Sequence, residues 1–319
     1  MHIGVSGEVR LVVTGSDGVV TTDTGFQKNL ILNQGLNFFG GGNGTDMFSR
    51  CVIGSGNSTP VNTQVALDSV AAIASGKHSS FKYDYVDDGS GFYKTNRVSK
   101  YSFTGLNNVN ISEVGLVSNG TTTSNYYLCT RALIKDSSGS PTAVTIRTGE
   151  TLDVYYKVWQ VFSITDVNRV VNMLDGAGGS VAYNTKLRMA SVGSSDYGSS
   201  AYVGEGVIGS FAQGLYASSS MQAFTQDVSV AITGKPSGTP LFETTITPSY
   251  VADSYKITFT ASVPVAQVGS VRSVLLRTTM GNYQVRYGSV TGDNPIPKTN
   301  KETLSIPFEV SWGRYEGVL

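Results

Sequence analysis

The sequence predicts an all-β protein made of two tandem antiparallel β-sandwich domains of related topology, each with one short helix. Three observations lead to this prediction. Apolar and polar residues alternate along several short segments, a period typical of strands with one buried face. Glycine is abundant, at 37 of 319 residues, and charged residues make up only 14%, a composition typical of short strands joined by tight turns. One strand pattern also occurs twice.

The repeated pattern lies in residues 150–159 and 302–310. Both segments begin with Glu-Thr-Leu, and their apolar residues then occupy every second position. Glu150 and Glu302, the first residues of the two segments, are 152 positions apart. A chain of this length also exceeds the size at which one core usually stops growing. We therefore expect one domain at residues 1–163 and a second, duplicated domain at residues 164–319.

The first half contains expected strands separated by turn sequences. Strands at 8–14 and 19–24 flank Gly-Ser-Asp-Gly, a strong hairpin turn. Residues 30–38 carry a mostly apolar helical stripe that ends at the glycines 40–42, so a short helix is expected there. The other strands are expected at 49–53, 81–86, 93–103, 111–117, 126–134, 144–146 and 150–159.

The order of elements restarts after Phe162. Residues 167–174 have a helix-like apolar spacing and precede the glycine-rich segment 175–179, as the first expected helix precedes its own glycines. Residues 188–194 resemble residues 50–55. Three further segments match 100–104, 111–116 and 127–131 of the first half: 255–260, 271–276 and 283–287.

The charge balance gives no indication of a nucleic-acid or membrane partner. Lys and Arg number 23, as do Asp and Glu, so no net charge attracts an anionic surface. A neutral surface gives little protection against self-association, which suits a subunit of a homo-oligomer. A ring of three such chains would present six similar domains, and a trimer would then match a six-fold partner.

The sequence carries no sign of a targeting segment. The first residues lack the basic region and apolar core of a signal peptide, and no apolar run approaches the ~20 residues of a membrane span. We expect a soluble protein that folds where it is made.

Candidates for catalysis or zinc binding are few. The histidines are His2 and His78, and a Ser-His-Asp or Cys-His arrangement would depend on His78, which lies in a polar, loop-like stretch. Cys51 and Cys129 are more typical of buried free thiols than of a disulfide, although a bond between them stays open. Their spacing from His78 does not match a zinc site. We expect no catalytic residue, no metal, no cofactor and no enzymatic activity.

One acidic cluster permits a cation site. Asp84, Asp87 and Asp88 precede Gly89, which places three carboxylates within five residues. The EF-hand pattern is absent, and Asp-Asp-Gly between two strands is also a favoured hairpin turn. The turn is the favoured interpretation, and the cation site stays open.

Two more patterns have a plain structural explanation. Residues 204–209 match the letters G-x-G-x-x-G, but no helix signal follows them, so a dinucleotide site is not expected. Tyr197, Tyr202 and Tyr216 lie in a Gly- and Ser-rich region and could form a platform for a glycan. Half-buried sheet tyrosines are the more common alternative.

Several stretches of the first half resemble structural proteins of tailed bacteriophages, often described as tail, fibre or minor structural components. The resemblance covers about residues 20–160, and the second half keeps the strand order without the same signatures. The stretches that carry it are Phe26 to Leu36, Val52 to Pro60 with Ala66-Leu67, Ser112 to Val117, and Arg131 to Ile134.

The resemblance implies a virion component, made in the host bacterial cytoplasm, without enzymatic activity. We expect a structural subunit of the tail, collar or baseplate region that binds copies of itself and other virion proteins. One alternative is a fibre or receptor-binding module that recognises a host surface glycan, and a second is a capsid decoration protein. A depolymerase is the least favoured reading, because acid and base candidates are missing.

Overall fold

The computed structural model describes residues 1–41, 47, 49–74, 82–87, 89–122, 125–190, 219–232, 234–246, 249–278 and 281–319. The described part is nearly all β, as predicted. The elements of the first half are β1 (His2–Thr14), β2 (Val20–Asp23), β3 (Gln27–Ile31), α1 (Asn33–Gly41), β4 (Arg50–Gly54), β5 (Val70–Ile73), β6 (Lys82–Asp87), β7 (Phe92–Phe103), β8 (Val109–Ile111), β9 (Glu113–Thr122), β10 (Asn125–Leu128), β11 (Thr130–Leu133), β12 (Val144–Ile146) and β13 (Thr151–Ser163).

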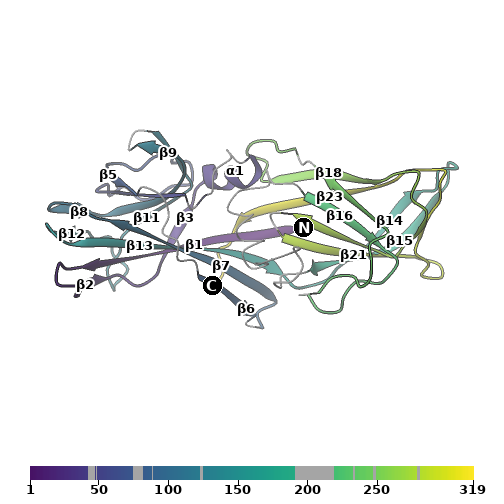
Figure 1. Cartoon of the computed structure of the whole chain (residues 1–319), viewed down its shortest axis with the longest axis horizontal. Helices are drawn as coiled ribbons and strands as arrows, with labels where there is room; N and C mark the ends of the chain where they lie inside the picture. The colour runs from purple at the N-terminus through teal and green to yellow at the C-terminus, as the bar shows by residue number, and fades with distance from the viewer. Residues whose placement is uncertain are drawn as a thin grey trace.

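The second half follows with further strands. They are β14 (Val167–Leu174), β15 (Ser180–Ala190), β16 (Ser219–Phe224), β17 (Phe242–Ile246), β18 (Lys256–Val263), β19 (Gly269–Val271), β20 (Ser273–Thr278), β21 (Gly281–Ser289), β22 (Ile296–Lys298) and β23 (Leu304–Arg314). Figure 1 shows an elongated molecule, with β2, β8 and β12 towards one end and β14 and β15 towards the other.

Two large sheets form the body of the molecule. The first follows the order β5-β4-β9-β11-β3-β1-β13-β7-β6, and the second follows β14-β15-β21-β20-β16-β17. The long strand β1 is antiparallel to β13 over twelve pairs, from Ile3↔Phe162 to Thr14↔Thr151. The start of β1 also pairs in parallel with the end of β23, so the last strand of the second half joins the first sheet.

The alternating pattern at residues 150–159 forms β13, as predicted. Leu152, Val154, Tyr156 and Val158 are all buried. They belong to one contiguous apolar cluster that contains residues of both halves, for example Ile3 and Val274. The described halves therefore share a core, and the boundary between residues 163 and 164 stays a prediction.

The ladder registers of the closing strands occur twice. Leu152 faces Phe103 in the first half, and Leu304 faces Val263 in the second. If 152 is added to the residue numbers of β12 and β13, and 160 to those of β7 and β8, the β13–β7 and β12–β8 pairs of the first half become the β23–β18 and β22–β19 pairs of the second half. The predicted match of the strands at 111–116 and 271–276 has the same 160-residue shift, since β9 and β20 occupy equivalent positions.

The prediction of a helix at residues 167–174 is wrong. Residues 167–174 are strand β14 and form a hairpin with β15, because Val167, Val170 and Val171 are β-branched and no buried apolar stripe exists for a helix to present. The glycine-rich segment after it is the hairpin turn, in which Asp175 Oδ1 accepts hydrogen bonds from the N–H groups of residues 177 and 179. The described part of the second half contains no helix.

The predicted counterpart of residues 50–55 is also wrong. Arg188 and Met189 of β15 pair with β21, as Leu30 and Ile31 of β3 pair with β11. β16 pairs with β20 in the same way that β4 pairs with β9, so β16 is the counterpart of β4. Residues 188–194 and 50–55 have a similar composition, but the strands they pair with show that they are not equivalent. The match of 100–104 to 255–260 finds the right two strands, β7 and β18, but its register is displaced.

Candidate functional site

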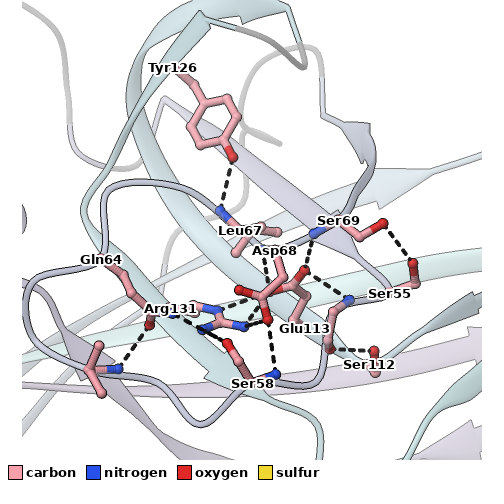
Figure 2. A network of polar contacts seen from close by, with 12 residues as sticks. Ser55, Ser58, Gln64, Leu67, Asp68, Ser69, Ser112, Glu113, Tyr126 and Arg131 are labelled. Atoms are coloured by element: carbon pink, nitrogen blue, oxygen red, sulfur yellow. Dashed lines mark hydrogen bonds and ion pairs between the residues drawn. The ribbon is translucent and has the colours of Figure 1, made fainter.

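The best-defined polar site is a buried ion network beneath the loop that joins β4 to β5 (Figure 2). Its centre is Arg131 on β11, whose side chain has no exposed surface. Arg131 Nε donates to Glu113 Oε2 at 2.9 Å, and Arg131 Nη2 lies 2.7 Å from Asp68 Oδ2. Arg131 Nη1 donates to Ser58 Oγ at 3.1 Å. We call these four residues the Arg131 network and residues 55–69 the clamped loop.

Glu113, the first residue of β9, holds both ends of the clamped loop. Its side chain is fully buried. Oε1 accepts hydrogen bonds from the N–H groups of Gly56 and Ser69, both at 2.9 Å, and Oε2 accepts one from the N–H of Asp68 at 3.2 Å. A buried carboxylate is tolerated when it is both paired with a cation and hydrogen-bonded, and both conditions are met here.

Further hydrogen bonds complete the attachment of the loop. The hydroxyl of Tyr126 accepts a hydrogen bond from the N–H of Leu67 at 3.0 Å, and Ser112 Oγ donates to the carbonyl of Gly56 at 2.7 Å. The pKa of Asp68 is lowered from its ordinary value by hydrogen bonds from Ser58, with a smaller effect from the guanidinium. Asp68 is therefore held in its charged form, which the network requires.

Two glycines leave the space that the Glu113 carboxylate fills. A Cβ on Gly56 would lie 2.3 Å from Glu113 Oε1 and 2.4 Å from Asp68 Cβ. A Cβ on Gly54 would lie 2.4 Å from the carbonyl oxygen of Ser69. Such distances are far inside van der Waals contact, so the Gly-Ser-Gly segment is explained by close packing around the carboxylate.

We expect Gly56→Ala to lower the free energy of unfolding by about 1–3 kcal/mol, the usual cost of overpacking a filled interior. Urea unfolding followed by circular dichroism measures this. Gly313→Ala is the matched control, because its Cβ would meet the His2 ring only at 3.4 Å. Equal losses in the two variants would contradict the tight fit around Glu113.

The Arg131 network holds the inner side of the clamped loop, and the outer side of the loop faces solvent. Val61 is 51% exposed and Val65 is 61% exposed. The loop is also braced internally, since the N–H of Val61 donates to Gln64 Oε1 at 2.9 Å. Exposed apolar side chains on a constrained backbone can be covered by another surface at a small cost in conformational entropy.

An equivalent loop in the second half is held by the amide of Gln284 together with the guanidinium of Arg188, whose Nη1 donates to the carbonyls of Ser229 and Val230 at 2.9 Å. Ladder pairs place Gln284 where the first half has Arg131, and Ser273 where it has Glu113. Gln284 is fully buried, and its amide accepts a hydrogen bond from the N–H of Ser229 at 2.7 Å and donates to the Ser229 carbonyl at 3.3 Å. Ser229 lies in the loop between β16 and β17, where Val230 is 90% exposed. Both halves thus hold a solvent-facing loop with a buried polar side chain.

The structure places several residues singled out from the sequence. Cys51 and Cys129 are buried and form no disulfide. They lie on opposite sides of Leu116, which pairs with Cys51 and whose carbonyl accepts a hydrogen bond from the N–H of Cys129. Burial raises the pKa of the Cys51 thiol. His2 lies in β1, where its ring Nδ1 is 3.1 Å from Ser311 Oγ.

The acidic cluster coincides with a hairpin. Asp84 and Asp87 belong to β6, which pairs with β7, and Asp88 lies outside the described residues. Other candidates that lie outside the described residues are His78, the segment 204–209, Tyr197, Tyr202 and Tyr216. Within the described ranges, no group of three His, Cys, Asp or Glu residues is arranged to hold a metal ion. No helix in the same ranges is long and apolar enough to span a membrane.

No protein-family model matches this chain, and searches of curated proteins and of solved structures also find no match. The site must therefore be interpreted from its own contacts.

Sequence reasoning did not single out Arg131 and Glu113 as a pair. A signal was present, because each is a lone charge in a mostly apolar stretch of the sequence, and a charge at such a position needs a buried partner. The three stretches that meet in the network, 52–60, 112–117 and 131–134, are among those on which the expectation of a virion protein is based.

Proposed function

We propose that this chain is a non-enzymatic structural subunit of a tailed-bacteriophage virion, in the tail, collar or baseplate region. There it joins copies of itself and neighbouring virion proteins. The clamped loop carries the proposal: the stretches that resemble virion proteins converge on the Arg131 network, and that network fixes a solvent-facing loop. A loop that is ordered before binding suits a lasting contact with a neighbouring protein.

The mechanism is mutual burial of surfaces. Covering Val61 and Val65 removes apolar area from water, at about 25 cal/mol per Å², while the backbone beneath them keeps its position. Strand edges that are exposed in the single chain are covered in the same way, which removes sites of uncontrolled strand pairing. The energy of assembly thus comes from interfaces and from no chemical step.

Particles purified from cells that carry the gene test the proposal. We expect mass spectrometry to find this chain in the particles, and a map of the intact particle to place it in the tail, collar or baseplate. Absence from the particles would overturn the proposal. Hundreds of copies on the capsid would favour a decoration protein, and binding of the purified chain to host polysaccharide would favour the receptor-binding alternative.

A double variant tests the role of the clamped loop. We expect Val61→Asp with Val65→Asp to reduce incorporation into particles at least tenfold, because two charges would have to be desolvated at the contact. Stability should not change, since both side chains are mostly exposed. Val19→Asp, at a side chain that is 59% exposed on the β1–β2 turn, is the control. Equal incorporation of all three proteins would show that the loop makes no contact.

A further inference from the structure

Within the described residues, no strand pairs with the outer edge of β14, although its counterpart in the first half is fully covered. Residues 7–9 of β1 pair with β3 as residues 167–169 of β14 pair with β15, so β1 and β14 are equivalent. The other edge of β1 is covered by β13 over twelve pairs. β23 is equivalent to β13, but it pairs with β18 and with the start of β1, and β15 is the only described strand that pairs with β14.

A proline lies on the side of β23 that corresponds to the β1-facing side of β13. Ser311 N–H donates to the Met1 carbonyl and the Met1 amino group donates to the Glu309 carbonyl, so odd-numbered residues of β23 direct their backbone groups towards the β1 side. Pro307 is one of these residues and has no N–H to donate. Its counterpart in β13 is Tyr155, which pairs with Arg10. A β14–β23 ladder equivalent to that of β1 and β13 would therefore lack the hydrogen bond that residue 307 would donate.

The free edge is long and poorly protected. β14 has eight residues with no proline, no lysine and no bulge, which are usual protections of an exposed edge, and its one charged residue is Arg169. Val170 is 63% exposed and Leu174 is 86% exposed. Figure 1 places β14 near one end of the molecule.

The backbone geometry of β14 restricts how another strand can add. The N–H of Asp175 donates to the Gly179 carbonyl, so in the alternating antiparallel pattern the even-numbered residues of β14 point their N–H and C=O groups outward. A strand added to this edge must bond to Val170, Asn172 and Leu174.

We propose that two copies of this chain associate through antiparallel pairing of their β14 strands, centred on Asn172. In this register Asn172 faces Asn172 of the second copy, Val170 faces Leu174, and Arg169 faces Asp175. The pairing forms two opposite-charge pairs and two apolar pairs across a two-fold axis. Neighbouring two-fold registers do not bring Arg169 opposite an acidic side chain, so charge complementarity selects this one.

The inference deepens the proposed function by naming a surface for self-association, but it depends only on β14 and can be tested without a virion. It also differs from the three-fold ring predicted from the repeat, because pairing of identical strands in this way is two-fold. A molar mass of three chains would favour the ring and overturn the β14 contact.

Cysteine cross-linking tests the register directly. We expect Asn172→Cys in the purified full chain to form a disulfide-linked dimer under mild oxidation, because residues facing each other across the two-fold axis lie at about 5.5 Å between Cα atoms. Asn168→Cys is the control, since residue 168 does not face itself. The native thiols of Cys51 and Cys129 are buried and should not interfere. Equal cross-linking of the two variants, or none in either, would overturn the register.

Light scattering with size-exclusion chromatography tests the contact without a cross-link. We expect the wild-type chain, of 33.8 kDa, to show a dimer mass that dissociates on dilution. Val170→Pro should give a monomer with an unchanged unfolding midpoint, because it removes only an outward N–H. Arg169→Glu should weaken dimerisation at least tenfold, whereas Lys135→Glu, at an exposed residue of the first half, should not. A wild-type monomer at all concentrations, or a dimer that survives Val170→Pro, would overturn the proposal.

Discussion

Replacing Arg131 by methionine should lower the free energy of unfolding by about 3–5 kcal/mol, a large share of the total stability of an ordinary domain. The reason is electrostatic. Without the guanidinium, Glu113 would remain as a fully buried carboxylate with no cation, and Asp68 would lose its partner at 2.7 Å. Methionine fills much of the same space, so the loss reports the missing charge more than a cavity. Urea unfolding followed by circular dichroism measures it.

Two further variants show whether the loss arises from burial. The Lys256–Glu309 pair is 54% and 50% exposed, and Lys256→Met should cost no more than about 1 kcal/mol. Adding Glu113→Gln to Arg131→Met should recover part of the stability, because a neutral amide costs less to bury than an unpaired charge. If Arg131→Met cost no more than Lys256→Met, the Arg131 network would not hold the clamped loop.

Trp312→Ala should destabilise the chain by about 3–5 kcal/mol, the usual cost of removing a large aromatic side chain from a core. Trp312 is on β23 but contacts the first half. Its Nε1 donates to the carbonyl of Leu36 in α1 at 2.8 Å, and its ring lies 5.5 Å from that of Tyr250. We also expect a shallower dependence on urea concentration, because the two halves would no longer unfold as one unit.

Circular dichroism is the appropriate probe, because the variant removes one of only two tryptophans and so changes the fluorescence signal. Trp312→Phe separates the two contributions. It keeps most of the apolar contact and loses only the hydrogen bond, so it should cost about 1–3 kcal/mol. A loss below about 1 kcal/mol for Trp312→Ala would show that this contact does not join the halves.

The elements that the sequence predicts best are those with a strict period and clear ends. β13 follows from four alternating apolar residues, and α1 follows from the stripe around Leu36 that ends at glycines. The segment that became β14 has an apolar spacing that fits a helix. Its register with β15 decides the outcome, and a single segment does not contain that information.

The candidate site was less predictable, because its parts are distant in the sequence. Arg131 lies 18 positions from Glu113 and 63 from Asp68. The motifs that contain these residues can be recognised, but their meeting point depends on the order of strands β4, β9 and β11 in the sheet. The unpaired edge of β14 could not be predicted for the same reason, since Pro307 lies on another strand, far from β14 in the sequence.

The parallel pairing of β1 with β23 determines how the molecule would respond to mechanical force. The N and C labels lie near the middle of the long axis in Figure 1, where His2 faces Ser311 and Val5 faces Arg314. Tension applied to the two termini would pull these strands in opposite directions along their length. Their hydrogen bonds would be loaded in shear and would have to rupture together, whereas an antiparallel hairpin pulled at its open end separates one bond at a time.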